Sequence, residues 1–181
     1  KSNAAIIMNN FFNEAKKLIE SNGLEIKTIS IGGSPQMWKA HEVPLATEYR
    51  VGTYIYNDKS LIVAGACEIE DCALTILTTV ISTPAPNRAV IDAGSKVLTS
   101  DLMGLEGHGL IVGYPDLTIS QLSEEHGCIT SNTSTNLRVG QRIQVIPNHA
   151  CVVSNMVDHV VFIEDDQVLL HEPVVARGKV W

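Results

Sequence analysis

A histidine and a cysteine two residues apart are the pair in this sequence with the most obvious capacity for chemistry. His149 and Cys151 follow the apolar, β-branched run that begins at Gln141. Imidazole nitrogen and thiolate sulfur are both good zinc ligands. Because side chains at i and i+2 of a strand point to the same face, the pattern predicts two metal ligands on one strand face. The alternative is a packed histidine beside a buried free thiol.

Two further polar clusters have residue types that can do chemistry. Glu124, Glu125 and His126 end a predicted strand, where they can supply a metal ligand or an acid–base group, or form an ordinary charged turn. Lys96 lies near Asp92, and a desolvated lysine can form a Schiff base. A lysine at a strand end is more often solvated or salt-bridged. The sequence therefore favours a solvated or salt-bridged Lys96 over a Schiff-base lysine.

A glycine pair follows the first predicted strand. Residues 4–21 have helical apolar spacing and residues 24–31 alternate as a strand, so together they predict one α/β unit. Gly32 and Gly33 come next, before Ser34. Glycines there let backbone N–H groups approach an anion closely, although an ordinary turn has the same composition. The phenol of Tyr54, further on, can bind a phosphate or simply pack.

The remainder of the chain has the pattern of a mainly β domain. Short apolar stretches alternate with turns rich in Gly, Asp, Asn and Pro, which predicts an antiparallel β-sandwich or barrel-like domain. The predicted strands are residues 49–57, 72–83, 88–93, 110–113, 117–122, 141–146, 157–164 and 167–175. We therefore predict two parts: residues 1–48 as the last helix and strand of a TIM-type α/β barrel, and residues 49–181 as a C-terminal β domain.

Composition limits the classes of function. Apolar residues make up 45% of the 181 residues, and the net charge is −7, so a core can form while a basic nucleic-acid-binding face is excluded. No apolar run is long enough to span a bilayer. Four scattered cysteines and no signal-like N-terminus predict reduced thiols in the cytoplasm.

Seven short motifs, in this order, resemble the C-terminal half of the D-threonine aldolase and D-serine dehydratase family. The likeness extends over nearly the whole chain from about residue 20. The motifs are Ile31–Pro35, Glu48–Tyr54, Asp71–Leu74, Asp92–Lys96, Ser123–Gly127, Pro147–Cys151 and Ala176–Gly178. The resemblance implies an alanine-racemase-like barrel that holds pyridoxal phosphate, followed by a β domain.

The resemblance also implies roles for individual residues. His149 and Cys151 stand where the dehydratase branch has its ligands for zinc or another divalent metal. That metal is expected to hold the hydroxyl group of a D-amino acid substrate. Gly32, Gly33 and Ser34 match the loop that holds the cofactor phosphate, and Tyr54 matches a tyrosine close to it. Glu124, Glu125 and His126 receive no role from the resemblance.

Some positions depart from the family pattern. Val51 replaces a usual proline and Ser34 a usual threonine, which keeps the hydroxyl group. No segment of the given sequence matches the region of the family's Schiff-base lysine. We therefore expect residues 1–181 alone to lack pyridoxal-dependent activity.

The predicted function is that of a pyridoxal-dependent, metal-assisted lyase for D-β-hydroxy amino acids, of the D-serine dehydratase or D-threonine aldolase type. In the aldolase branch the second metal ligand is more often a carboxylate, so Cys151 favours the dehydratase. A homodimer is expected by analogy with relatives. The alternatives are an amino-acid racemase of related fold and a non-catalytic β module for binding or regulation.

Overall fold

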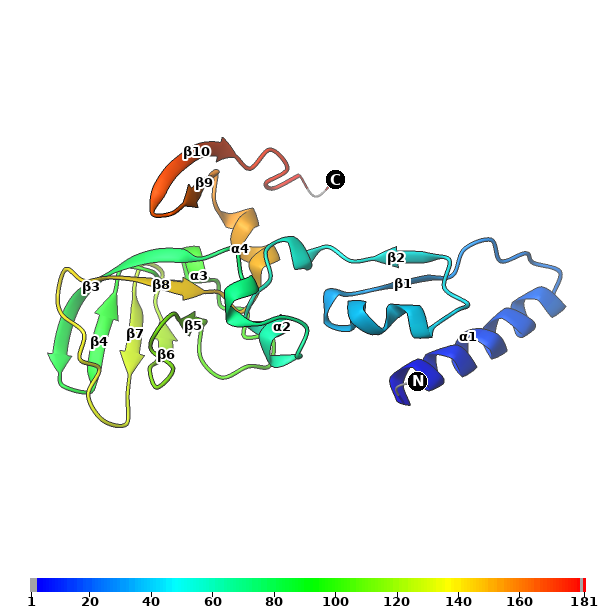
Figure 1. Ribbon diagram of the computed structural model, residues 1–181, viewed down its shortest axis with the longest axis horizontal. Coiled ribbons are helices and arrows are strands. Elements are labelled where there is room, and N and C mark those ends of the chain that lie inside the picture. The colour runs from blue at the N-terminus through cyan, green and yellow to red at the C-terminus, as the bar shows by residue number, and fades with distance from the viewer. Residues whose placement is uncertain (1–2, 180) are drawn as a thin grey trace.

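The computed structural model describes residues 3–179 and 181, and it is an elongated molecule. A long helix lies at one end and a β domain at the other (Figure 1). The helices are α1 Asn3–Ser21, α2 Lys59–Val63, α3 Ser95–Leu98 and α4 Ala150–Met156, with 3-10 helices η1 Ser34–Glu42, η2 Thr53–Ile55 and η3 Ile69–Asp71. The strands are β1 Ser30–Gly32, β2 Glu48–Arg50, β3 Ile76–Ala85, β4 Arg88–Ile91, β5 Leu110–Ile111, β6 Thr118–Leu122, β7 Gly127–Thr130, β8 Arg142–Ile146, β9 His159–Glu164 and β10 Gln167–Pro173.

The N-terminal unit consists of α1, β1, η1 and β2. The helix predicted at residues 4–21 is confirmed, and it ends where Gly23 adopts a φ of +80°. Ala5 of α1 packs against Ile31 and Val43 in a small core. β1 and β2 pair in parallel, and η1 lies between them in the chain. β2 crosses the expected boundary between residues 48 and 49.

Two strand predictions in this unit are confirmed only in part, the strand over residues 24–31 at residues 30–31 and the strand over residues 49–57 at residues 49–50. Residues 24–29 form no strand, because β2 is only three residues long and pairs with residues 30–32, and the Ile29 N–H donates to the Thr47 hydroxyl instead of to a strand. The strand predicted at residues 49–57 stops at Arg50. Beyond Gly52 the chain coils into η2, where the Asn57 N–H donates to the Thr53 carbonyl oxygen at 2.8 Å.

The β domain is a six-stranded antiparallel sheet, which confirms the predicted barrel-like class. Its strand order is β5-β8-β3-β4-β7-β6, and the sheet curls until it is nearly closed. The strands predicted at residues 88–93 and 141–146 are found as β4 and β8, in which Ala89, Ile91, Ile143 and Val145 are buried. The sequence did not predict β7, a strand of four residues that follows a charged turn. The buried core is aliphatic and includes Val80, Ile91, Ile119, Ile129 and Val145.

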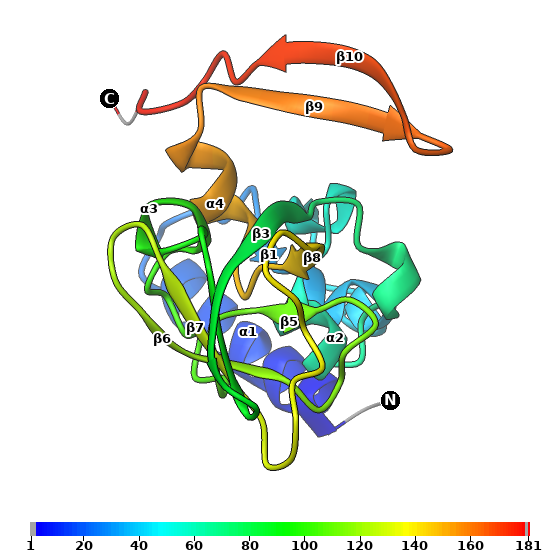
Figure 2. The same ribbon diagram turned by 90° about the vertical axis from the view of Figure 1, so that its left-hand side faces the viewer.

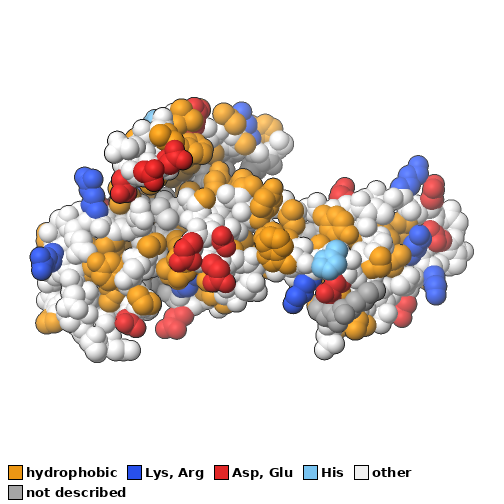
Figure 3. Space-filling view, in the orientation of Figure 1, with side chains coloured by type: hydrophobic (Ala, Val, Ile, Leu, Met, Phe, Trp, Pro, Cys, Tyr) orange, Lys and Arg blue, Asp and Glu red, His pale blue; other side chains and the backbone are white. Residues whose placement is uncertain are grey.

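A two-stranded hairpin, β9–β10, stands away from the barrel-like sheet (Figure 2). Both strands were predicted from sequence. Six apolar side chains on it are about half exposed or more, from 48% for Leu170 to 69% for Val168. The hydrophobic colouring of Figure 3 covers parts of this hairpin and of the narrow joint between the two parts of the molecule. Among the described residues, no helix is both long and apolar enough to cross a bilayer.

Candidate functional site

His149 and Cys151 lie at the start of helix α4, and the prediction that a strand carries them is wrong. Strand β8 ends at Ile146, and Pro147, which has no N–H to donate to a sheet, follows it. His149 is the N-cap residue of α4 and Cys151 is the second residue of the helix. A strand-to-helix turn therefore presents the two side chains.

A carboxylate orients the imidazole of His149. The Nδ1 atom lies 2.8 Å from Oδ2 of Asp101, and the His149 side chain is 26% exposed. With Nδ1–H donating to the carboxylate, Nε2 keeps its lone pair, as in histidines that bind metals. The hydrogen bond from His149 holds the pKa of Asp101 below its usual range. The sequence analysis did not single out Asp101, because it is 48 residues away in the chain and belongs to no motif.

The thiol of Cys151 is exposed and has a hydroxyl neighbour. Its Sγ lies 3.2 Å from Oγ1 of Thr53, which belongs to η2. This contact joins residues 98 positions apart in the chain. It brings the start of α4 next to the segment that contains Tyr54.

A buried asparagine fixes the turn that precedes His149. Asn148 is 2% exposed. Its Oδ1 accepts the Gly109 N–H at 3.0 Å, while its Nδ2 donates to the carbonyl oxygens of Gly107 at 2.8 Å and Leu102 at 3.4 Å. These bonds attach the loop that includes Asp101 to the turn that includes His149. The buried Asn148 side chain therefore helps to set the distance between the Asp101 and His149 side chains.

The donor atoms fit a divalent metal in an open site. Within residues 3–179 and 181, no group of three or more His, Cys, Asp or Glu side chains is placed to hold an ion. A closed structural zinc site needs four protein ligands, so the described residues do not build one. It offers an imidazole whose other nitrogen is hydrogen-bonded and a thiol, and it leaves further positions for water, substrate or other groups.

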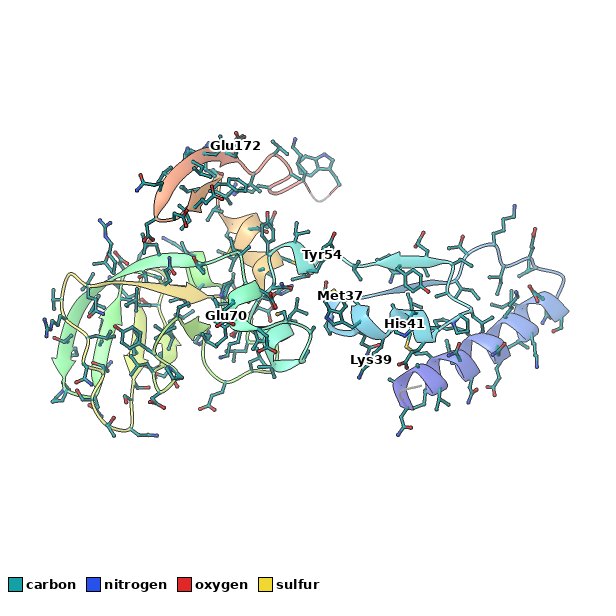
Figure 4. The ribbon with its side chains drawn as sticks, viewed as in Figure 1. Met37, Lys39, His41, Tyr54, Glu70 and Glu172 are labelled. Carbon is teal, nitrogen blue, oxygen red and sulfur yellow. The ribbon has the colours of Figure 1, made fainter. Side chains whose placement is uncertain are left out.

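The glycine–serine loop and Tyr54 lie together at the joint of the two parts. Gly32 approaches β2 so closely that a Cβ would lie 3.1 Å from the Arg50 carbonyl oxygen. Ser34 is buried at the start of η1, and its Oγ accepts the Tyr54 N–H at 3.2 Å. Figure 4 shows Tyr54 at the end of the β domain that faces this unit. The serine hydroxyl, the phenol and the start of η1 are groups that suit an anion.

The other polar clusters form a structural contact. The side chains of Lys96 and Glu125 are paired and about 60% exposed. Backbone bonds hold the same two segments together, because the Ser95 N–H donates to the Ser123 carbonyl oxygen at 2.8 Å. Lys96 is therefore salt-bridged, as the sequence favoured, and Glu125 is its partner.

Comparison with known proteins identifies related sequences. A family model described as "Putative serine dehydratase domain" matches residues 73–163, half of the chain. An uncharacterised protein of Mycobacterium tuberculosis (strain H37Rv) is 37% identical over 129 residues, which cover 68% of this chain and 97% of that protein. The D-serine dehydratase of Dictyostelium discoideum is 30% identical over 175 residues, which cover 84% of this chain and 44% of that enzyme.

Solved structures share the fold. The D-threonine aldolase of Filomicrobium marinum superposes with a TM-score of 0.80 at 24% identity, over 98% of this chain and 48% of that one. A D-threo-3-hydroxyaspartate dehydratase has been solved with a histidine replaced by alanine (TM-score 0.81, 24% identity, 93% and 48% coverage). It has also been solved with a cysteine two positions later replaced by alanine, in the metal-free form (TM-score 0.77, 24% identity, 94% and 50% coverage).

Proposed function

Because this chain belongs to the serine dehydratase domain family, we propose that it is the C-terminal part of a pyridoxal-phosphate-dependent, metal-assisted lyase for D-β-hydroxy amino acids. The resemblance to D-serine dehydratases and D-threonine aldolases is confirmed, and those relatives are lyases. The chain spans less than half the length of the enzymes just named. Cofactor, metal and substrate are therefore our proposals.

The observation that carries this proposal is the pair of His149 and Asp101 beside Cys151. An imidazole that donates Nδ1–H to a carboxylate presents Nε2 to a metal, and an exposed thiol follows two residues later. The hydroxyaspartate dehydratase has been altered at a histidine and a cysteine with the same separation, and the cysteine variant is in the metal-free form. This likeness supports the pair as ligands of zinc or another divalent metal.

Each residue has a defined task under this proposal. His149 Nε2 and Cys151 Sγ hold the ion, and Asp101 keeps the imidazole in the required tautomer and orientation. A divalent metal held there supplies a Lewis acid for the substrate's β-oxygen. Two protein ligands would leave further positions of such an ion for that oxygen.

The proposed binding site for the cofactor phosphate is at the joint between the N-terminal unit and the β domain. We propose that Gly32, Gly33, Ser34 and Tyr54 hold the phosphate of pyridoxal phosphate, which supplies an electron sink when bound. The Ser34 hydroxyl accepts from the Tyr54 backbone and can still donate its own proton to a phosphate oxygen. The Schiff-base lysine has no counterpart in the given sequence, so we expect residues 1–181 alone to be inactive.

Elemental analysis of metal content tests the proposed ligands. We expect near-stoichiometric metal in the parent protein and little in the His149→Ala, Cys151→Ala double variant. Cys128→Ala is the matched control, because that thiol is on β7 and contacts Nε of Arg88 at 3.1 Å. Equal metal content in the parent and the double variant would contradict the assignment.

A second candidate function is a stand-alone β module without catalysis. It is favoured by the mycobacterial relative, in which the 129 aligned residues are 97% of the protein, so that relative is shorter than this chain. Binding of a metal together with a β-hydroxy amino acid would favour the lyase. If the folded chain binds neither a metal nor an amino acid, that result would favour the non-catalytic module.

We also propose a cytoplasmic homodimer. The four cysteines form no disulfide, which suits a reducing compartment. The β9–β10 hairpin supports self-association, because runs of apolar residues in both strands expose apolar side chains on both of its faces. Sheets with two apolar faces are normally covered on both sides.

A further inference from the structure

Asp58 is a fully buried carboxylate that no motif of the sequence analysis used. Its side chain is 0% exposed. We propose that Asp58 is a positioning residue for the metal ligands, because it holds the peptide group that joins His149 to the residue before Cys151. This inference rests on the proposed metal site and adds a residue to it.

The carboxylate has three hydrogen-bond partners from two elements. Oδ1 accepts the Leu61 N–H at 3.1 Å and the Ser60 hydroxyl at 2.6 Å, both within the first turn of α2. Oδ2 accepts the N–H of Ala150, the first residue of α4, at 2.9 Å. One side chain therefore caps the N-termini of two helices, and its negative charge suits the positive end of both.

This arrangement leaves the His149 side chain free for a ligand. An N-cap residue normally bonds its own helix through its side chain, and histidine is a poor choice for that task. His149 makes no such capping bond. Asp58 supplies the acceptor from 92 residues away, so the imidazole of the N-cap residue can turn to Asp101 and to a metal.

Backbone contacts extend the same support. The Lys59 N–H donates to the Pro147 carbonyl oxygen at 3.0 Å and the Ser60 N–H to that of Asn148 at 3.3 Å. The start of α2 is therefore attached to each of the two residues that precede His149. Since Tyr54 and Thr53 lie a few residues earlier, residues 53–60 connect the proposed phosphate site to the proposed metal site.

Two substitutions of Asp58 separate positioning from folding. Asp58→Asn keeps the shape, but an amide has one acceptor oxygen, so one of the two backbone N–H groups loses its partner. Asp58→Ser retains a good N-cap for α2 but is too short to reach Ala150. Ser60→Ala is the control, because it removes one donor to the same carboxylate and leaves the bond to Ala150 in place.

Cobalt(II) binding measures the effect on the ligand pair. Affinity comes from competition with a chelator, and the thiolate-to-cobalt absorption band reports whether Cys151 is bound. We expect Asp58→Ser to bind cobalt about 10–100-fold more weakly, in the range found for residues that support metal ligands. Ser60→Ala should stay within about twofold of the parent. Parent-like affinity and absorption in Asp58→Ser would overturn the proposal, as would an equal loss in Ser60→Ala.

Amide hydrogen exchange at Ala150, measured without metal, keeps this inference separate from the proposed function. If the parent binds no cobalt, the metal proposal fails. Protection of the Ala150 amide in the parent that is lost in Asp58→Ser would still support the role of Asp58 in holding this peptide. Equal exchange of that amide in parent and variant would exclude the role, whatever the metal result.

Discussion

At the scale of single residues, Gly94 is the position most dependent on having no side chain. A Cβ there would lie 2.4 Å from the Glu124 carbonyl oxygen, which is fixed by its hydrogen bond from the Lys96 N–H. Because backbone on both sides must move, we expect Gly94→Ala to lower the free energy of unfolding by about 1–3 kcal/mol. Urea unfolding followed by circular dichroism measures this.

Gly52→Ala is the control for this experiment. No atom lies within 4 Å of a Cβ at Gly52, and its φ of −140° is open to alanine. We expect little change there. If the two variants lose equal stability, the close approach at Gly94 is not the cause.

The carboxylate of Asp92 predicts a pH dependence of stability. The Thr78 hydroxyl at 2.6 Å and the Thr79 N–H at 2.7 Å hold the pKa of Asp92 below its usual value. A lowered pKa in the folded state contributes stability above the unfolded pKa of about 3.9, and this contribution is lost as the pH falls through the folded pKa. Asp92→Asn should therefore be less stable than the parent at pH 7, and the difference should shrink below about pH 4.

Thermal unfolding of both proteins at several pH values checks this prediction. A difference in stability that stays constant down to pH 2 would mean that the charge of Asp92 does not matter.

Sequence predicted the ligand types of the candidate site and missed the residues that support them. His149 and Cys151 were found because they are neighbours in the chain. Asp101 contacts His149 from 48 residues away and Asp58 accepts the N–H of Ala150 from 92 residues away, and no local pattern reports such contacts. Pro147 was the available sign that the strand ends before the histidine, since proline cannot donate to a sheet.

At the scale of elements, η1 is connected to the β domain by a tryptophan. Nε1 of Trp38 donates to the Ala66 carbonyl oxygen at 2.7 Å, although the side chain is 68% exposed. We expect Trp38→Phe to lower the free energy of unfolding by about 1 kcal/mol, the usual net value of one hydrogen bond. Urea unfolding measures the change. Trp181→Phe, at a side chain that is 96% exposed, is the control and should be neutral.

The accuracy of the strand predictions depends on where the partner strands are. The strands of the β domain pair with strands of the same domain, and β3, β4, β5, β6 and β8 each overlap a predicted strand, although β3 begins at Ile76 and not at residue 72. In the N-terminal unit, β1 and β2 have only each other among the described residues, and three residues of each form the ladder. The alternating pattern of residues 24–31 therefore predicted a strand that is too long. Such a pattern carries no information on the length of the strand with which it pairs.

At the scale of the whole molecule, the hairpin predicts the state of association. Phe162 of β9 is opposite Leu170 of β10, and each is about half exposed. Phe162→Lys with Leu170→Glu replaces two of the six exposed apolar side chains of the hairpin and puts opposite charges across the strands, which preserves the hairpin. We expect light scattering to show a dimer for the parent and a monomer for this variant.

Leu77→Lys is the control for the dimer prediction, because Leu77 is 62% exposed on β3. It should remain a dimer. If the hairpin variant also remains a dimer, another surface joins the copies.

The contact of Asp58 with Ala150 has a consequence for biosynthesis. During translation, Asp58 leaves the ribosome 92 residues before its partner, and Thr53 leaves 98 residues before Cys151. Closing such a long loop is slow and is favourable only after the strands between have folded. The two proposed metal ligands therefore come into register last, and under the proposed function a newly made chain would acquire its ion after the β domain has formed.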